Sequence, residues 1–301
     1  MTLSDRRILL VHAHPDDETI GNGATMAKYV AEGVQVTLVT CTLGEEGEVL
    51  IPELSHLAAD QEDGLGAHRV EELALAMKAL GVTDHRFLGG PGHFRDSGMK
   101  WDDNGAATAA DDTRPDTFWH ADLTVAADLL VEIIRELKPQ VVVTYDQFGG
   151  YGHPDHVQAH RVTTYAVALA AVRSYKPELG ASWDAPKLYW TAMSRSQMSD
   201  GIRALREAGD TTTFEEWDPD NLPFGASDDE IDAVVDAMAY ADAKMDAMKA
   251  HATQITLDGP FFALSNNLGN QVWGKEHYRL AKGVRGPVGA DGFEEDLFAG
   301  L

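Results

Sequence analysis

The chain has 301 residues, and its 49 Asp and Glu outnumber its 24 Lys and Arg, which gives a formal net charge of −25. So negative a surface repels phosphate backbones and anionic lipids, and we therefore expect no nucleic-acid partner and no membrane association. Cys41 is the single cysteine, which excludes an intrachain disulfide and a cysteine-cluster metal site. The apolar run 8–11 is too short for the core of a signal peptide, so we expect a cytoplasmic protein.

Strands and helices are predicted to alternate over the first third of the chain. The apolar run 8–11 predicts a strand that is buried on both faces, and a helix is expected over 23–32. The β-branched residues of 34–41 predict the second strand. Apolar residues at helical spacing predict a helix over 68–80, and a short strand is expected over 86–88. The loop 89–120 that follows is rich in Gly, Asp and Asn.

The same alternation continues to about residue 172. One apolar face over 122–137 predicts a helix, and Pro139 stops it. A buried strand is expected over 141–145 and a further helix over 154–172. This order predicts an α/β fold with a Rossmann-like, mostly parallel twisted sheet and helices on both faces.

The alternation weakens beyond residue 175. A strand is predicted over 187–191 and a long amphipathic helix over 228–252, whereas 253–301 shows little periodicity. We therefore divide the chain into a Rossmann-like metal-binding core, residues 1–175, and a smaller C-terminal subdomain, residues 176–301. The second part is expected to pack on the core and to close its binding crevice.

The polar residues collect where the predicted strands end. His-Pro-Asp occurs twice, at 14–16 after the first strand and at 153–155 after the strand over 141–145. One such triplet is an ordinary turn sequence, because Pro and Asp favour turns. Two copies at strand ends point to a site, because open α/β sheets bind ligands at the carboxyl ends of their strands.

Histidine nitrogens together with a carboxylate predict a hydrolytic metal centre. This ligand set suits zinc with a position left for water, and it also suits ferrous iron. Asp16 and Asp17 diverge from neighbouring positions, so one can bind the ion while the other acts as general base. Of His153 and His156, one can bind the ion and the other can reach the substrate. A protonated His153 would stabilise an oxyanion, and Tyr151 could donate a further hydrogen bond.

These motifs resemble those of the LmbE-like, PIG-L-type metal-dependent de-N-acetylases. The matching segments are spread over nearly the whole chain, and they are most similar to the mycothiol-biosynthesis branch of the family. Gly21 departs from the pattern, because the branch's deacetylases usually have Ser there. The segments that carry the resemblance are 11–18, 40–48, 95–98, 149–156, 250–254, 264–268 and 276–278.

The resemblance implies a role for each residue of the motifs. Asp16 would be the general base, His153 would stabilise the oxyanion or act as general acid, and Tyr151 would donate to the oxyanion. Arg69 and Asp96 would contact hydroxyls of the substrate, and Asp155 would orient His153 from the second shell. The implied metal ligands are His14, Asp17 and His156.

The resemblance also implies the reaction. The expected activity is metal-dependent removal of the N-acetyl group from N-acetylglucosaminyl-inositol, which releases acetate and glucosaminyl-inositol. The cofactor would be one divalent ion per chain, zinc with iron(II) as the alternative, and the partner a small amino-sugar substrate. The alternatives are a mycothiol S-conjugate amidase and a deacetylase of another N-acetylglucosamine derivative. The sequence predicts no oligomeric state.

Other histidines and glycines allow competing interpretations. We interpret His12 as packing or second shell because it ends a buried strand, and His160 as structural. His251 is either a contact from the C-terminal part or an ordinary interface residue. The run 21–26 invites a dinucleotide-binding interpretation, but its third glycine is missing. The G-x-S-x-G motif of serine hydrolases is absent from the sequence.

Overall fold

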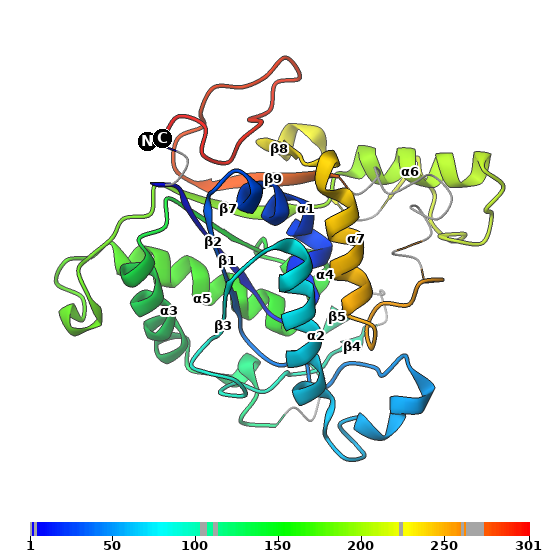
Figure 1. Ribbon diagram of the computed structural model, residues 1–301, viewed down its shortest axis with the longest axis horizontal. Coiled ribbons are helices and arrows are strands. Elements are labelled where there is room, and N and C mark those ends of the chain that lie inside the picture. Colours follow the sequence, from blue (N-terminus) through cyan, green and yellow to red (C-terminus); the bar gives the residue numbers. More distant parts are fainter. Residues whose placement is uncertain are drawn as a thin grey trace.

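The structure is a computed structural model that describes residues 2, 5–102, 107–110, 114–222, 225–259, 262 and 274–301. Within these residues, seven strands form one sheet in the order β3-β2-β1-β6-β7-β9-β8 (Figure 1). The first five strands of this order run parallel, and β9 is antiparallel to both of its neighbours. The strands are β1 (Arg7–His12), β2 (Gln35–Thr40), β3 (Asp84–Phe87), β6 (Val141–Thr144), β7 (Lys187–Ala192), β8 (Ala233–Asp236) and β9 (Lys275–Lys282). A separate two-stranded sheet pairs β4 (Lys100–Trp101) with β5 (Ala107–Thr108).

Helices cover both faces of the sheet (Figure 1). Alternate residues of β1 point to opposite faces, so Ile8 packs in one core and Leu9 in the other. The first core includes residues of α1, α2 and α7, and the second includes residues of α3 and α5. The α-helices are α1 (Asp17–Ala31), α2 (Leu65–Leu80), α3 (Leu123–Leu137), α4 (Gly149–Gly152), α5 (Pro154–Ala170), α6 (Arg195–Glu207) and α7 (Ala241–Ala250). Short 3-10 turns lie at η2 (Pro52–Leu57), η3 (Phe118–His120), η4 (Pro177–Leu179), η5 (Asp228–Glu230) and η6 (Met238–Tyr240).

This architecture confirms the predicted α/β fold with a mostly parallel sheet. Helix α3 begins where expected, because the Asp122 carboxylate accepts hydrogen bonds from the backbone N–H groups of Thr124 and Val125. The helix ends at Lys138 in the left-handed conformation, directly before Pro139. None of the helices in the described ranges combines the length and the apolar character that a membrane crossing requires.

The prediction of one long helix over 228–252 is wrong. That segment contains β8 and only then α7, because Ala233 and Val235 are buried in the sheet and β8 pairs with β9. Helix α6 and strand β9 were not predicted. Strands β7, β9 and β8 extend the same sheet that contains β1, and the division of the chain at residue 175 stays a prediction.

Candidate active site

The two His-Pro-Asp turns lie at the carboxyl ends of neighbouring strands. Strand β1 pairs in parallel with β6, so the loop after each strand opens at the same edge of the sheet. The first turn leads into α1, which crosses to β2, and the second leads into α5 on the opposite face. The chain reverses its direction of winding between β1 and β6, which is where open α/β sheets bind their ligands.

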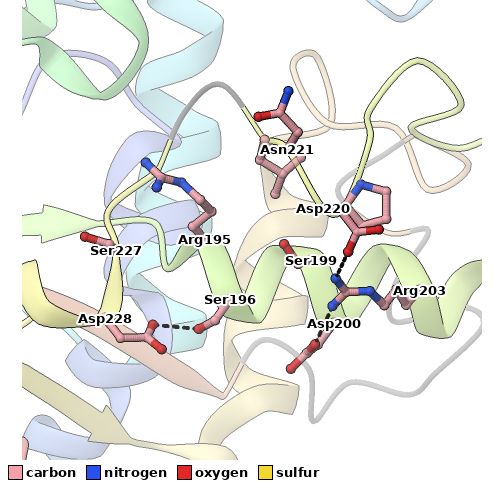
Figure 2. A pocket seen from close by; sticks show the side chains of 11 residues that line it. Arg195, Ser196, Ser199, Asp200, Arg203, Asp220, Asn221, Ser227 and Asp228 are labelled. Carbon is pink, nitrogen blue, oxygen red and sulfur yellow. Dashed lines mark hydrogen bonds and ion pairs between the residues drawn. The ribbon is translucent and has the colours of Figure 1, made fainter.

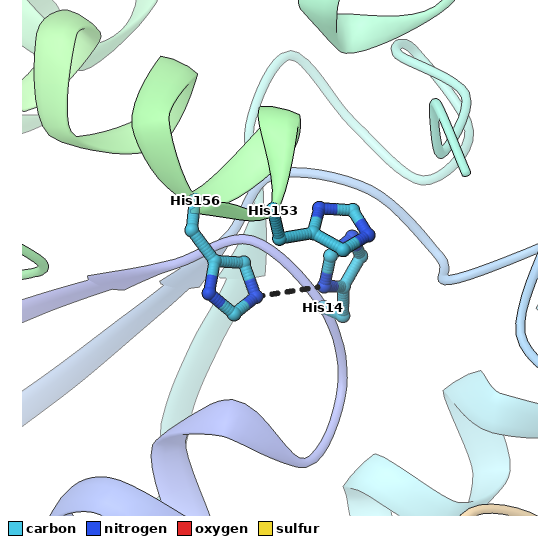
Figure 3. A group of neighbouring side chains, drawn as sticks. All are labelled: His14, His153 and His156. Atoms are coloured by element: carbon cyan, nitrogen blue, oxygen red, sulfur yellow. Dashed lines mark hydrogen bonds between the residues drawn. The ribbon is translucent and has the colours of Figure 1, made fainter. Parts of the chain in front are cut away.

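Three side chains from these turns converge on one point. His14 Nδ1 lies 3.3 Å from His156 Nε2 and 3.3 Å from an Asp17 carboxylate oxygen. The other Asp17 oxygen lies 3.2 Å from His156 Nε2. Figure 3 shows the rings of His14 and His156 facing each other, with His153 beside them. The predicted ligands are therefore brought together, and His14, His153 and His156 also form a group whose spacing would suit a metal ion.

The outer nitrogens of the two predicted ligand histidines face hydrogen-bond acceptors. His14 Nε2 lies 3.3 Å from an Asp155 oxygen and 3.4 Å from an Asp96 oxygen. His156 Nδ1 lies 3.1 Å from the carbonyl oxygen of Gly149. A ring that donates its proton outward keeps the lone pair of its inner nitrogen free, as a metal ligand requires. The donor set therefore fits a divalent ion held by His14, Asp17 and His156.

The charges around His14 favour a cation. Although burial favours the neutral ring, Asp96, Asp155 and Asp17 raise the pKa of His14 well above its usual value. Burial opposes ionisation of Asp17, but His156 and His14 hold the pKa of that carboxyl well below its usual range. A buried histidine facing three carboxylates needs a positive charge nearby, and a divalent ion would supply it.

Asp16 lies beside this group without pointing to the same nitrogens. Its carboxylate accepts a hydrogen bond from Arg69 at 3.0 Å, and Asp17 is its neighbour in the chain. Burial and the neighbouring charge of Asp17 together raise the pKa of Asp16 to about 6, against the opposing effect of Arg69. A carboxyl group with a pKa near the working pH suits a general base. The separate positions of Asp16 and Asp17 agree with the division of roles that the sequence predicts.

His153 is placed as a neutral hydrogen-bond donor. Its Nδ1 accepts the backbone N–H of Asp155 at 3.1 Å, so the proton of the neutral ring sits on Nε2. Burial, together with the charges of His14 and His156, lowers the pKa of His153 to about 2. We expected a protonated ring at this position; the described surroundings instead favour the neutral form.

Tyr151 stands at the exposed side of the group. Its side chain is 48% exposed, and its ring lies 5.1 Å from the His156 ring. Helix α4, which carries Tyr151, is a single turn in which Gly149 has a φ of 64°. A Cβ at Gly149 would lie 2.6 Å from the His156 Cβ, so this close approach requires glycine.

Arg69 and Asp96 are more buried than the implied contact with substrate would suggest. Arg69 is 2% exposed, and its guanidinium donates to the carbonyl oxygens of Gly44 and Pro15 as well as to Asp16. Asp96 is 4% exposed and accepts the backbone N–H of Gly98 at 2.9 Å. Their contact with a substrate stays a prediction.

Asp155 contacts a different histidine from the one expected. Its carboxylate, which is fully buried, faces His14 and accepts two hydrogen bonds from Ser97, one from the backbone N–H at 2.9 Å and one from the hydroxyl. Only the backbone of Asp155 touches His153. Pro154 and Asp155 are the first two residues of α5, whose N-cap is His153. The sequence did not predict Ser97 as a partner of Asp155, although segment 95–98 is one of the segments that resemble the family.

The remaining histidines stand outside this group. His12 Nε2 accepts a hydrogen bond from the Asn22 side-chain NH2 at 2.9 Å, and its ring packs edge-on against Tyr145, as the packing interpretation expects. His160 bonds to the carbonyl oxygen of Tyr145 and packs on Trp190. Tyr145 itself was not predicted, yet its hydroxyl accepts the N–H of Ala13 and its ring stacks on His156 at 4.2 Å. Segment 264–268 and parts of the loop 89–120 lie outside the described residues.

A hollow of about 430 Å³ lies elsewhere, along α6 (Figure 2). Several of its polar side chains are bonded to one another: Arg203 pairs with Asp200 and Asp220, and the Ser196 hydroxyl donates to Asp228. The predicted site residues are not among those that line it. We assign it no chemistry.

The comparisons with known proteins show the family to which the chain belongs. The family model of GlcNAc-PI de-N-acetylase (PIG-L) matches residues 9–167, which include both turns. The 1D-myo-inositol 2-acetamido-2-deoxy-alpha-D-glucopyranoside deacetylase of Kribbella flavida is 68% identical over 301 residues, covering 99% of each chain. The protein of the same name from Streptomyces avermitilis is 53% identical over 300 residues, covering 99% of this chain and 98% of its own.

A solved structure shares the fold. N,N'-diacetylchitobiose deacetylase from Pyrococcus horikoshii superposes with a TM-score of 0.59 at 18% identity, over 91% of this chain and 83% of its own. At that identity the likeness concerns the fold alone. The sequence match and the family model go further: the chain belongs to the GlcNAc-PI de-N-acetylase (PIG-L) family.

Proposed function

We propose that this chain removes the acetyl group from 1D-myo-inositol 2-acetamido-2-deoxy-α-D-glucopyranoside, using zinc and Asp16 as general base. The substrate is the one that the relatives are named for, and the chain matches those relatives over nearly its whole length. The observation that carries the chemistry is the convergence of His14 Nδ1, His156 Nε2 and the Asp17 carboxylate beside Asp16.

The residues of the site then divide the work of amide hydrolysis. When bound by His14, Asp17 and His156, a divalent ion would polarise the amide carbonyl and lower the pKa of a water molecule. Asp16 accepts the proton of the attacking water and later delivers it to the nitrogen of the leaving amine. His153 Nε2–H donates to the oxygen that becomes negative, and the Tyr151 hydroxyl supplies a second donor from the exposed side. The C–N bond breaks, and acetate and the free amine leave.

The proposed roles are tested by measuring metal content and amine release on the same preparations. Turnover is followed by release of primary amine from the acetylated substrate, and bound metal by elemental analysis. Asp16→Ala should retain the ion and lose turnover by about 10²- to 10⁴-fold, because a general base contributes that much. Asp17→Ala should lose both, because it removes a ligand. The exposed Asp60→Ala is the control and should match the wild type.

The substrate and the metal are tested in the same assay. Zinc-loaded protein prepared in air and iron(II)-loaded protein prepared without oxygen should be compared, each with the acetylated substrate and with a mycothiol S-conjugate. We expect the zinc protein to be active and the acetylated substrate to have the higher kcat/KM. A faster reaction with the S-conjugate would assign the amidase activity instead, and a pure, active protein without a stoichiometric divalent ion would end the metal-hydrolase proposal.

A further inference from the structure

Asp16 has a backbone conformation that the chain must hold in place. Its φ is 127° and its ψ is −34°, outside the region that residues other than glycine usually adopt. Such a conformation is strained and persists only when the surroundings fix it. The carbonyl oxygen of Asp16 accepts the N–H groups of Thr19 and Ile20, as the start of α1 requires. The N–H of Asp16 has a different partner, the Glu18 carboxylate at 2.9 Å.

Glu18 depends in turn on a residue from the other end of the chain. It is fully buried, and the oxygen that does not bond Asp16 lies 3.0 Å from His251 Nε2. His251 is also fully buried and directly follows α7. A buried carboxylate is costly unless it is hydrogen-bonded, and the Thr19 hydroxyl donates to the same Glu18 oxygen at 2.6 Å. His251 adds the second contact from a distant segment, which fixes the rotamer in which Glu18 reaches the Asp16 N–H.

The residues after His251 hold the other side of Asp16. The Thr253 N–H and hydroxyl donate to the Glu72 carboxylate at 2.8 and 2.7 Å. Glu72 belongs to α2, the helix whose Arg69 binds the Asp16 carboxylate. Segment 251–254 therefore contacts the two structures that reach Asp16: Glu18 at its backbone and the helix that carries Arg69 at its side chain.

We infer that segment 251–254 positions the general base, with His251 acting through Glu18 on the backbone of Asp16 and Thr253 acting through α2. This inference rests on the role proposed for Asp16. His251 is a positioning residue, because its Nε2 contacts Glu18 and Thr19 and not the converging ligand atoms. The inference gives a role to segment 250–254, which resembles the family motif but takes no part in the proposed hydrolytic chemistry.

The test measures kcat, KM and bound zinc in His251→Ala, His251→Gln and Thr253→Val. His251→Ala should lower kcat about 10- to 100-fold, the range found when an outer partner of a site is removed, with KM and zinc content unchanged. His251→Gln should recover most of the lost rate, because its amide nitrogen can donate from the position of Nε2. Thr253→Val should lower kcat less, because it keeps the backbone bond to Glu72.

Lys244→Met separates positioning from stability. Lys244 lies on α7, the helix that His251 follows, and it forms a buried ion pair with Glu276 at 2.7 Å. The Glu276 carboxylate in turn accepts hydrogen bonds from the backbone N–H groups of Ala24 and Thr25, in the second half of α1. The Lys244→Met variant should lower the thermal midpoint of unfolding as His251→Ala does, yet leave kcat within about twofold of the wild type. Equal losses of kcat in the two variants would overturn the inference.

A double substitution decides whether His251 acts through Asp16. In the Asp16→Ala background, His251→Ala should change the residual rate less than about twofold, because coupled residues are non-additive. A further fall as large as in the wild type, or a wild-type kcat in His251→Ala alone, would overturn the positioning role and leave the proposed function intact. A wild-type kcat in Asp16→Ala would overturn both.

Discussion

Gly149→Ala tests whether the backbone of α4 sets the affinity for metal. Gly149 has a φ of 64°, and its carbonyl oxygen is the partner of His156 Nδ1. Left-handed backbone costs about 1–2 kcal/mol in residues with a Cβ. The added Cβ would also lie 2.6 Å from the His156 Cβ and 2.9 Å from the Val157 nitrogen, where carbon contacts are ordinarily about 3.5–4.0 Å. The turn must therefore move by about 1 Å, which is the difference between the 2.6 Å contact and an ordinary carbon contact.

The expected result is a weaker metal site. A shift of that size breaks the bond between the Gly149 carbonyl and His156, and loss of such an outer partner weakens metal affinity about 10- to 100-fold, or about 1.4–2.8 kcal/mol. The assay is zinc affinity by competition with a chromogenic chelator, with urea unfolding measured in parallel.

Two glycines supply matched controls. Gly150 is in the same turn with a φ of 76°, and Gly33 lies far from the site with a φ of 83°; an added Cβ meets nothing within 4 Å at either position. Both alanine variants should lose stability from backbone strain. Their zinc affinity should stay within about threefold of the wild type, because neither displaces His156. Wild-type affinity in Gly149→Ala, or an equal loss in Gly150→Ala, would refute the reasoning.

Three further predictions concern the rim of the site and the stability of the fold. Trp101 is 60% exposed and lies 6.3 Å from the Tyr151 ring, so Trp101→Ala should raise KM by roughly 2- to 10-fold without lowering kcat, as steady-state kinetics would reveal. Burial lowers the pKa of His277 to about 4, so the unfolded chain takes up a proton first and stability falls as pH drops from about 6.5 through 4. His277→Gln should remove up to about 3 kcal/mol of that fall, checked by urea unfolding at pH 7 and pH 4; an unchanged pH dependence would contradict it. Lys187→Met leaves Glu294 buried without its partner at 2.6 Å and should cost about 3–5 kcal/mol of unfolding free energy, and a loss below about 1 kcal/mol would argue against it.

The predicted elements were reliable where one face or both faces of an element are apolar. The run 8–11 became β1, and the apolar face of 122–137 became α3. Strand β9 shows why the C-terminal part was harder. Its inward side chains include Glu276, whose burial depends on Lys244 from α7, so no hydrophobic alternation marks the strand.

The sequence predicted those residues of the site that directly follow the ends of strands. The convergence of His14, Asp17 and His156 follows from two adjacent parallel strands. The partner of Asp155 did not follow, because the start of α5 directs its carboxylate across to His14. Contacts set by helix geometry and by distant segments leave little trace in local sequence.

The 233 residues that separate Glu18 from His251 give the enzyme an order of assembly. The three converging side chains lie within the first 156 residues and next to the parallel part of the sheet, whereas His251 comes after six of the seven strands of that sheet have been synthesised. Contacts so distant along the chain form late in folding, because a long loop must close first. On the roles proposed above, a growing chain acquires the three proposed metal ligands well before the segment that positions the proposed base, and we expect uptake of metal to precede hydrolytic activity.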